Sequence, residues 1–583
     1  MSAERARLID LAERWIADDP DADTRAELRA LIDAEDIDAL AERFAAPLEF
    51  GTAGLRGLLG AGLSRMNAAN VARAAHAVAK DALARDPDAA HKGIVVGRDG
   101  RHKSDELARI SAEVIAGLGV RVHWLPDPSP TPVAAFLGVY LDAAAVVVVT
   151  ASHNPPAYNG FKVYSARGSQ IVSPQDADIR AIRDAVERVA DLPRVAFTEG
   201  VEKHLVRVVG EREKAAFFEA LEAQCLGPVP PPAQVSAVTT SLHGVGHPWL
   251  LEMLARRGHR HVFPVLAQAA PDGDFPTVAF PNPEEKGALD LAYALGRDKY
   301  AELIVANDPD ADRLAAAVRD DASDTGYRPL SGNELGLLLG DWLLSEGARR
   351  GALPERSLVV TTIVSTTALE ALAAARGARY REVLTGFKWI LDAAFEGAER
   401  GETFVFGFEE ALGYCCGRAV RDKDGIGAAA VLMELAAALK ARGKTLLDRL
   451  DELALEIGVT ATDQVAVTLA GADGIARIGR VMAAIRAEPP EWIGGVAVRR
   501  SRDLASAADA EAAGLPGGDV LTYWLEGGGR VVMRPSGTEP KLKCYLEASA
   551  PVGDAGLDAA RADAKALVGR LAAWVRARID QIP

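Results

Sequence analysis

Short apolar segments along the chain alternate with longer segments of helical periodicity. Each apolar segment runs directly into a loop rich in glycine, proline, aspartate or serine, which is typical of a strand that presents a functional loop at its C-terminal end. Such segments occupy residues 93–101, 143–156, 302–313, 403–413 and 530–538. Between them, Ala/Leu-rich stretches with helical spacing occupy residues 104–118, 335–344 and 428–439. Strands that alternate with helices predict an α/β architecture.

The chain is long enough for several domains. Leucines and isoleucines recur at helical spacing among the charges of the first forty-odd residues, which predicts an amphipathic helical extension. The 583 residues predict roughly four domains. Boundaries are expected at the proline-rich stretch 226–233, near 327–332 and around 457–463. The predicted segments are therefore 1–45 for the extension, 46–225, 234–328 and 329–458 for α/β domains, and 459–583 for the last domain.

The charge balance limits which ligands the chain can bind. Lys and Arg number 66 against 82 Asp and Glu, a net charge of −16 that repels nucleic acid and anionic membranes unless basic groups gather locally. An anionic small ligand therefore requires a focused basic cleft. The longest purely apolar run, 143–149, is far shorter than the roughly 20 residues that cross a bilayer. Residues 1–19 carry charges where a secretory signal is apolar, so we expect a soluble cytoplasmic protein.

The four cysteines predict neither a disulfide framework nor a zinc site. Cys225, Cys415, Cys416 and Cys544 form no CxxC pair and have no metal-like spacing. We expect reduced, structural thiols.

Ser152 is the candidate nucleophile. It lies just past an apolar segment, in a loop whose prolines fix the backbone, so that its hydroxyl is oriented for attack. His153 is a candidate general base, but no acidic partner is identifiable from the sequence and a hydrolytic triad is unsupported. The alternative is a Pro/Asn turn with an incidental serine.

Asp308, Asp310 and Asp312 form the candidate metal site. Carboxylates at alternate positions of a loop can turn to one side, and three hard oxygen donors suit Mg²⁺. An EF-hand is excluded, because the central glycine and distal glutamate are missing. The alternative is a solvated acidic turn, which the preceding apolar strand disfavours: clustered carboxylates repel one another unless a cation offsets them.

The loop at 534–543 has the composition of a phosphate cradle. Arg534 binds oxygens bidentately, Ser536 and Thr538 supply hydroxyls, and Gly537 leaves backbone N–H groups unobstructed. A plain surface turn is the alternative, and no segment matches a Walker motif.

Two further segments carry weaker signals. Residues 407–413 contain paired carboxylates that suit sugar hydroxyls, although such pairs are usually just solvated. Lys388 lies among apolar neighbours, where burial would lower its pKa toward acid/base use, but most such lysines extend to the surface.

Taken together and in this order, these motifs resemble the α-D-phosphohexomutase superfamily, specifically its longer phosphoglucomutase/phosphopentomutase-type members. The resemblance covers about residues 51–543. It implies that Ser152 carries a phosphoryl group and that Asp308, Asp310 and Asp312, with the phosphoserine, bind Mg²⁺. The remaining roles that it implies are these: an active-site arginine at Arg56, a matching segment ending at Lys162, a general acid/base at Lys388, a sugar-selecting loop at Glu409, and a loop for the non-reacting phosphate at Arg534, Ser536, Gly537 and Thr538.

The family fold implies three related α/β domains and a smaller C-terminal α+β domain around a central cleft. Arg56, Lys162, Arg313, Lys388 and Arg534 would then form a local cationic site on an acidic protein, with Arg313 among the substrate-binding residues. One departure concerns the sugar loop, where Ala411 occupies a position that is commonly serine in the family. The resemblance leaves the oligomeric state open between monomer and dimer.

The implied activity is that of a phosphosugar mutase, an isomerase. The leading reaction interconverts α-D-glucose 1-phosphate and glucose 6-phosphate, through the phosphoserine and glucose 1,6-bisphosphate as activator and intermediate. Mannose 1-phosphate and ribose or deoxyribose 1-phosphate are the alternative substrates. A Mg²⁺-dependent phosphatase using the same serine and a non-enzymatic sugar-phosphate sensor are the rival functions. Small-molecule sugar phosphates are thus the expected partners, with no nucleic acid and no membrane.

Overall fold

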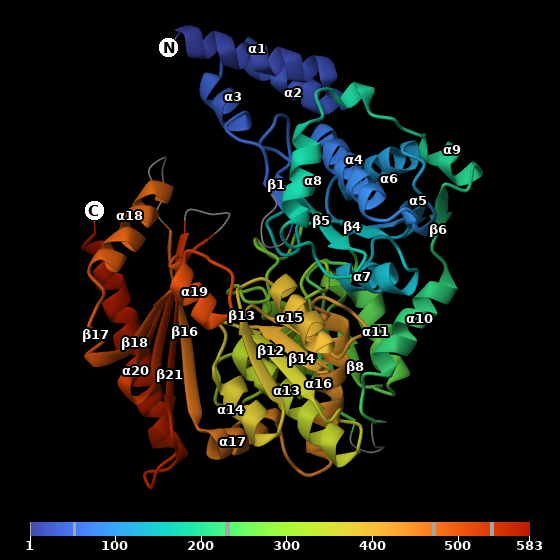
Figure 1. Cartoon of the computed structure of the whole chain (residues 1–583). Coiled ribbons are helices and arrows are strands. Elements are labelled where there is room, and N and C mark those ends of the chain that lie inside the picture. The colour runs from blue at the N-terminus through green and yellow to red at the C-terminus, as the bar shows by residue number, and fades with distance from the viewer. Residues whose placement is uncertain (1, 50–53, 228–233, 469–473, 537–540, 583) are drawn as a thin grey trace. The chain divides into compact units, whose positions relative to one another are not determined.

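The computed structural model describes residues 2–49, 54–227, 234–468, 474–536 and 541–582. The helices and strands are labelled in Figure 1, and the chain divides into two compact units. The first unit contains Met1–Leu330 and Leu412–Ala438, and the second contains Ser331–Ala411 and Leu439–Pro583. Among the described residues, no helix is long and apolar enough to cross a membrane.

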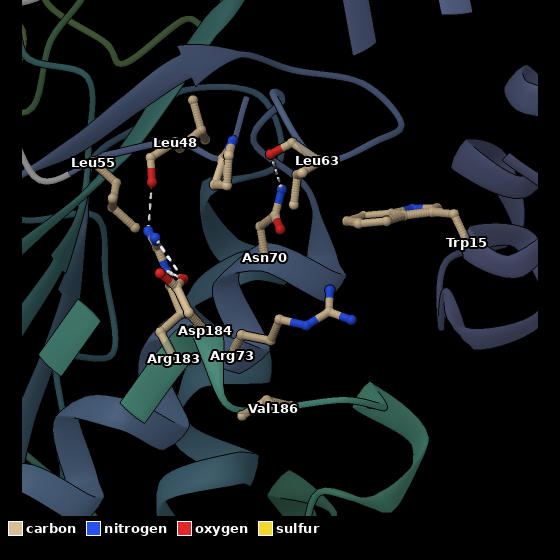
Figure 2. A pocket seen from close by; sticks show the side chains of 10 residues that line it. Trp15, Leu48, Leu55, Leu63, Asn70, Arg73, Arg183, Asp184 and Val186 are labelled. Carbon is tan, nitrogen blue, oxygen red and sulfur yellow. Dashed lines mark hydrogen bonds and ion pairs between the residues drawn. The ribbon is translucent and has the colours of Figure 1, made fainter. Parts of the chain in front are cut away.

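Three helices precede the first sheet: α1 (Ser2–Asp18), α2 (Ala22–Asp33) and α3 (Ile37–Arg43). Their apolar faces share a small core with Ala61. Asp18 at the end of α1 accepts hydrogen bonds from the backbone N–H groups of Val189 (2.8 Å) and Ala190 (3.0 Å) and forms an ion pair with Arg73. A cavity of about 350 Å³ lies beside this junction, lined by Trp15, Arg73 and Leu55 among others (Figure 2). The helical extension is therefore fastened to the sheet domain by charge and backbone contacts around a cavity.

The first sheet has six strands in the order β1-β5-β4-β2-β3-β6. The strands are β1 (Leu55–Leu58), β2 (Ile94–Arg98), β3 (Val122–Trp124), β4 (Ala145–Val149), β5 (Tyr158–Ser165) and β6 (Val206–Val208). β2, β3, β4 and β6 are parallel, and β5 pairs antiparallel with both β4 and β1. The accompanying helices are α4 (Ala68–Arg85), α5 (Ala89–Lys92), α6 (Ser104–Gly117), α7 (Thr131–Tyr140), α8 (Gln175–Asp184), α9 (Phe197–Glu202) and α10 (Glu211–Glu222).

Both faces of this sheet are buried, as continuous apolar strands require. Along β4, Val147 and Val149 join the core that contains α4 and α6, whereas Val146 and Val148 join the core that contains α7 and α10. Alternate residues of a strand point to opposite faces, so one run of valines supplies both cores. The result is a three-layer α/β/α arrangement (Figure 1).

A second sheet in the same unit repeats this plan with five strands in the order β11-β10-β9-β7-β8. The strands are β7 (Ala237–Thr240), β8 (Val262–Pro264), β9 (Leu303–Ala306), β10 (Ala315–Arg319) and β11 (Tyr327–Pro329), and the helices are α11 (His247–Arg256) and α12 (Asp290–Lys299). β9 is parallel to β7 and antiparallel to β10, as β4 is parallel to β2 and antiparallel to β5. The unit also includes β15 (Gly413–Cys416) and most of α16 (Gly425–Lys440).

The second unit begins with a parallel three-stranded arrangement in the order β13-β12-β14. The strands are β12 (Ser357–Thr362), β13 (Arg379–Val383) and β14 (Thr403–Glu409), and the helices are α13 (Gly332–Arg349), α14 (Ala368–Ala375), α15 (Phe387–Glu399) and α17 (Leu446–Ile457). Its C-terminal part is an antiparallel sheet in the order β16-β21-β20-β19-β18-β17.

The strands of this antiparallel sheet are β16 (Val459–Thr468), β17 (Trp492–Ile493), β18 (Val496–Asp503), β19 (Leu521–Leu525), β20 (Gly529–Pro535) and β21 (Lys541–Ala550). Helices α18 (Gly474–Ala487) and α20 (Leu557–Asp580) share a core with one face, and α19 (Ala507–Ala513) packs on the other together with Ile363 and Val364. This is the smaller α+β domain.

The predicted architecture is confirmed: three α/β domains are followed by a smaller α+β domain. The five apolar segments form β2, β4, β9, β14 and β20, and the three helical stretches correspond to α6, α13 and α16, with α6 ending one residue before the predicted limit. Within the predicted boundary at 226–233, residues 228–233 lie outside the described residues, as do Gly537 and Thr538 of the predicted phosphate loop.

Candidate active site

Ser152 lies in the loop that joins β4 to β5, and its backbone is held in an unusual conformation. Its φ is +52°, in the left-handed region that residues with a side chain rarely adopt. The Ser152 N–H donates to Thr150 Oγ1 at 2.9 Å. Only 1% of Ser152 is exposed. The loop thus presents a buried, oriented hydroxyl at the end of a fully buried strand.

Arg101 braces this loop through its backbone. The guanidinium donates to the carbonyl oxygens of Ser152 (2.6 Å), Pro155 (2.9 Å) and Tyr158 (3.3 Å), and also to that of Asn154. Asp99 forms an ion pair with Arg101 at 3.3 Å. These hydrogen bonds are accepted by backbone carbonyl oxygens. They therefore hold the backbone conformation of the loop independently of its side chains.

The aspartate triad lies in the loop that joins β9 to β10, the equivalent place in the second sheet. Ser152 Oγ donates to Asp308 Oδ2 at 2.8 Å, so the two loops meet at the predicted nucleophile. Lys162 on β5 donates to Asp310 Oδ2 (2.7 Å) and to Asp312 Oδ2 (2.8 Å). The three aspartates are all buried, and one ligand oxygen from each lies within 4.8 Å of the others.

Further groups support the triad from other parts of the unit. Thr131 Oγ1, at the start of α7, donates to Asp310 Oδ2 at 2.6 Å. Lys423 forms an ion pair with Asp312 at 3.3 Å. A Cβ atom on Gly425 would lie 2.1 Å from the Arg313 carbonyl oxygen, so only glycine allows α16 to begin this close to the loop. The triad is therefore held by β5, α7 and the segment before α16.

The pKa values of the aspartates in the triad are shifted in different directions. Burial and repulsion by Asp310 and Asp312 raise the pKa of Asp308 well above its ordinary value. Burial alone would also raise the pKa of Asp312, but Lys162, Lys423 and Arg313 lower it below its ordinary value. The buried Lys162 keeps a raised pKa because Asp310 and Asp312 outweigh the effect of its burial. Two of the carboxylates are thus charged and paired, and the third would need a further positive charge to ionise easily.

A divalent cation fits this donor set. Asp310 Oδ1 and Asp312 Oδ1 are buried and have no hydrogen-bond partner among the described residues, although buried carboxylate oxygens are nearly always satisfied. One carboxylate oxygen of Asp308 lies within 4.8 Å of one oxygen from each of the other two, and Asp308 Oδ2 accepts a hydrogen bond from the Ser152 hydroxyl. Hard carboxylate oxygens that converge in this way are ligands for Mg²⁺ or a similar ion.

His153 and the arginines near Ser152 are also placed. His153 Nδ1 lies 3.1 Å from Ser152 Oγ, and burial, followed by repulsion from Arg313 and Arg56, lowers its pKa well below the ordinary value. Arg56 on β1 donates to Asn154 Oδ1 at 3.3 Å. The Arg313 N–H donates to Asp308 Oδ1 at 3.0 Å, and its guanidinium forms an ion pair with Glu284 at 3.7 Å. His153 is therefore neutral at physiological pH.

The other predicted site residues belong to the second unit. Glu409 ends β14 and accepts a hydrogen bond at Oε1 from the Gly386 N–H (2.8 Å), directly before the helix that carries Lys388. Arg534 lies near the end of β20, and the Ser536 N–H donates to the Lys541 carbonyl oxygen at 2.8 Å. Arg534 and the carboxylates of Glu409 and Glu410 all act electrostatically on the hydroxyl of Tyr545, whose pKa burial raises.

The predicted residues thus divide into two groups, one in each unit. The first contains Arg56, Ser152, His153, Lys162, Asp308, Asp310, Asp312 and Arg313, and the second contains Lys388, Glu409, Arg534 and Ser536. Sequence reasoning missed Arg101, Thr131 and Lys423 in the first group. Arg101 ends the apolar segment 93–101 and could have been found there, whereas nothing local in the sequence marks Thr131 or Lys423.

Known proteins share this architecture. The chain matches the phosphoglucomutase/phosphomannomutase domains in order: α/β/α domain I over residues 47–189, α/β/α domain II over 215–322, α/β/α domain III over 331–455 and the C-terminal domain over 496–564. A solved phosphoglucomutase/phosphomannomutase family protein from Burkholderia thailandensis has the same fold, with a TM-score of 0.65 at 19% identity over 91% of this chain and 96% of its own.

Curated relatives cover most of the chain. The human phosphopentomutase is 34% identical over 97% of this chain and 96% of its own length. A Haemophilus influenzae protein named "Probable phosphomannomutase" is 42% identical over 78% of this chain and 88% of its own. The Staphylococcus epidermidis phosphoglucomutase is 32% identical over 86% and 91%. With all four family domains in order and relatives along nearly its whole length, the chain belongs to the phosphoglucomutase/phosphomannomutase family of phosphosugar mutases.

Proposed function

We propose that this mutase interconverts α-D-glucose 1-phosphate and glucose 6-phosphate through a phosphoserine at Ser152. The observation that carries the proposal is the meeting of two loops, which puts Ser152 Oγ 2.8 Å from Asp308 in a buried triad of aspartates. A hydroxyl in this position is a phosphoryl carrier next to a divalent cation site. Glucose 1,6-bisphosphate is the proposed intermediate and activator, and Mg²⁺ the proposed cation.

The proposed reaction has two transfers that mirror each other. In the first, the bond between phosphorus and Ser152 Oγ breaks, a bond forms to the free hydroxyl of the sugar monophosphate, and the hydroxyl proton passes to a base, for which Lys388 is our candidate. In the second, the bond between the other phosphorus and its sugar oxygen breaks, this phosphoryl group bonds to Ser152 Oγ, the Ser152 proton passes to the sugar oxygen, and the isomeric monophosphate leaves. Both transfers need the same cationic surroundings, because negative charge spreads over the phosphoryl oxygens.

The chain's own residues divide this work. Asp308, Asp310 and Asp312 would hold Mg²⁺, which when bound supplies positive charge next to the transferred phosphoryl group. Arg101 and the strained backbone of Ser152 orient the nucleophile. Lys162 neutralises Asp310 and Asp312, so that the site presents oriented carboxylates without a large net negative charge.

The remaining candidate residues are proposed to bind the substrate. Arg56 and Arg313 would bind the reacting phosphoryl group, and Glu409 the sugar hydroxyls. Arg534 and Ser536, together with Gly537 and Thr538 outside the described residues, would hold the non-reacting phosphate. We propose that the domain limits are those predicted from the sequence, and that the protein acts in the cytoplasm.

A pentose phosphate is the second candidate substrate, and a specific observation favours it. Phosphopentomutases and this chain align over nearly their full lengths, 97% of this chain and 96% of the human protein. Ala411 also removes a hydroxyl from the sugar loop, which weakens the requirement for a particular hexose. Mannose 1-phosphate is the third candidate, in view of the Haemophilus influenzae relative.

The test is ³¹P NMR of the purified protein with Mg²⁺ and a trace of glucose 1,6-bisphosphate. The 1-phosphates of glucose, mannose and ribose are incubated in parallel. Conversion to the terminal phosphate ester without free phosphate is expected, fastest for glucose. Faster conversion of ribose 1-phosphate would replace glucose by the pentose, and release of inorganic phosphate would overturn the mutase in favour of a phosphatase.

A matched pair of variants tests the nucleophile. Ser152→Ala removes the hydroxyl at the triad, and sustained turnover is expected to disappear. Ser165→Ala removes a hydroxyl from the far end of β5, where it donates to the Ser169 carbonyl oxygen at 3.3 Å, and activity is expected to stay. Normal turnover by the Ser152 variant would contradict the phosphoserine.

A further inference from the structure

Glu410, the second carboxylate of the sugar loop, accepts hydrogen bonds from two buried hydroxyls, those of Ser365 and Thr362. Ser365 Oγ donates to Glu410 Oε2 at 2.9 Å, and the Glu410 N–H donates back to Ser365 Oγ at 3.1 Å. Thr362 Oγ1 lies 2.9 Å from the same hydroxyl and 3.4 Å from Glu410 Oε2. Ser365 is 1% exposed. One side chain therefore holds both the backbone and the carboxylate of Glu410.

Ser365 is itself fixed by the C-terminal sheet. Arg530 on β20 donates through Nη2 to the Ser365 carbonyl oxygen and to Glu547 Oε2 (2.6 Å), and through Nη1 to Glu382 Oε1 (3.0 Å). Arg530 and Glu547 are paired across β20 and β21 and are 4% and 3% exposed. The ion pair thus ends directly on the backbone that carries the Ser365 hydroxyl.

Glu547 makes a second attachment to the same turn. Its carboxylate accepts hydrogen bonds from the Thr367 N–H at 3.0 and 3.2 Å and from Thr366 Oγ1 at 3.4 Å. Buried charges persist only when they are paired and hydrogen-bonded, and here both partners meet that condition. The turn at 365–367, between β12 and α14, is therefore a rigid connection between the C-terminal sheet and the sugar loop.

The sugar loop has little freedom on its other sides. Glu409 Oε1 accepts from the Gly386 N–H at 2.8 Å, which ties the loop to the segment before Lys388. A Cβ atom on Gly332 would lie 1.8 Å from the Glu410 carbonyl oxygen, so the loop backbone lies against the start of α13. Ala411, the next residue, has no hydroxyl that could replace Ser365.

We propose that Ser365 is a positioning residue for sugar selection, and that the Arg530–Glu547 pair of the C-terminal sheet supports it. The inference rests on the proposed function, since it assigns the discrimination between sugars to the orientation of the Glu409–Glu410 loop. Without the Ser365 hydroxyl, the Glu410 carboxylate loses a donor and its N–H loses an acceptor. A carboxylate that loses buried partners reorients toward water, and the loop that contacts the sugar moves with it.

The first test needs no substrate. Ser365→Ala is compared with Ser357→Ala, a control at the opposite end of β12 that removes a hydroxyl of similar burial, bonded to the Pro354 carbonyl at 2.6 Å. Hydrogen–deuterium exchange of the peptide around Glu410 is measured in both full-length variants. Exchange of the Glu410 amide is expected to rise by about tenfold or more in the Ser365 variant only. Equal exchange in the two variants would refute the attachment.

The second test measures discrimination. We expect the ratio of kcat/KM for glucose 1-phosphate to that for ribose 1-phosphate to change by about fivefold or more in Ser365→Ala, mainly through KM, and to stay unchanged in Ser357→Ala. A loss of kcat that is equal for both sugars would show a merely structural role and overturn the proposal.

A double-mutant cycle tests the support from the C-terminal sheet. Glu547→Gln is expected to shift the same ratio in the same direction, and the double variant Ser365→Ala/Glu547→Gln to shift it less than the sum of the two. Strictly additive changes of this ratio in the double variant would contradict the proposed support of Ser365 by the Arg530–Glu547 pair. If the wild type converts neither sugar phosphate, the proposed function fails, whereas the exchange result still decides whether Ser365 holds the loop.

Discussion

Replacing Arg101 by lysine is expected to damage the loop that carries Ser152 while keeping the positive charge. The guanidinium donates to four carbonyl oxygens of that loop, those of Ser152, Asn154, Pro155 and Tyr158. Lysine has a compact ammonium group that cannot span these oxygens as the planar fork does. The change therefore isolates the geometry of the brace from its charge.

The size of the effect follows from the bonds that are lost. If lysine keeps two of the four contacts, two charge-assisted hydrogen bonds at about 1.5 kcal/mol each give a loss of about 3 kcal/mol in stability. The left-handed backbone of Ser152 costs of order 1–3 kcal/mol and persists only because its surroundings impose it. Relaxation of that backbone would withdraw Ser152 Oγ from Asp308, with a fall in kcat of about tenfold to a hundredfold.

Two measurements check the expectation. Denaturant unfolding gives the stability, and mutase turnover with glucose 1-phosphate gives kcat. Arg109→Lys is the matched control, because Arg109 lies on the neighbouring helix α6 and pairs with the exposed Asp105 at 2.7 Å; it should change neither quantity by much. An Arg101→Lys protein with wild-type stability and kcat would show that the four carbonyl contacts do not hold the loop, and the reasoning would be wrong.

Three further predictions concern other parts of the chain. Burial raises the pKa of Asp424 from 3.8 to about 6 in the folded protein. As the pH rises, the unfolded chain therefore loses this proton before the folded protein does, and the free energy of unfolding falls between about pH 4 and 6. At 1.36 kcal/mol per pH unit, the fall in the free energy of unfolding amounts to about 3 kcal/mol. Asp424→Asn should therefore raise Tm at about pH 8 and raise it much less at about pH 4. An equal rise in Tm at the two pH values would contradict the burial effect. Mg²⁺ at a hundred times its Kd should stabilise the wild type by about 2.7 kcal/mol in thermal melting, and Asp310→Asn should lose most of this gain. Gly332→Ala should destabilise the protein by about 1–3 kcal/mol in urea, because its Cβ would lie 1.8 Å from the Glu410 carbonyl oxygen; an unchanged midpoint would show that the loop can yield.

The sequence was sufficient to predict five of the strands, β2, β4, β9, β14 and β20, and the loops that follow them. An apolar run such as 145–149 is long enough for a strand, too short for a membrane, and ends in a proline-rich loop, so both the strand and the place of Ser152 just past its end could be inferred. The aspartates at 308, 310 and 312 were equally readable, because their spacing is local. Candidate site residues that directly follow a strand can thus be predicted from the local sequence alone.

What the sequence did not reveal are contacts between residues far apart in the chain. Thr131 and Asp310 are 179 positions apart, yet their side chains lie 2.6 Å from each other. Arg101 serves a loop more than 50 positions away, and its role depends on where β2 and β4 lie next to each other in the sheet. Such pairings are products of sheet order, which no local pattern of residues specifies. For the same reason, the local sequence did not reveal that His153 is buried near Arg313 and Arg56, and that this burial and these arginines lower its pKa.

The lysines that pair with the triad bear on whether the protein can fold before it binds a metal ion. Lys162 and Lys423 neutralise two of the three aspartates from within the chain, so the carboxylates can be buried before any metal arrives. In small zinc domains the ion is required for folding itself, since nothing else offsets the ligands. Here Lys162 and Lys423 do so, and we therefore expect a metal ion to be a late and exchangeable addition. A chelator should therefore inactivate this protein without unfolding it, and the apoprotein should regain activity as fast as the ion can enter.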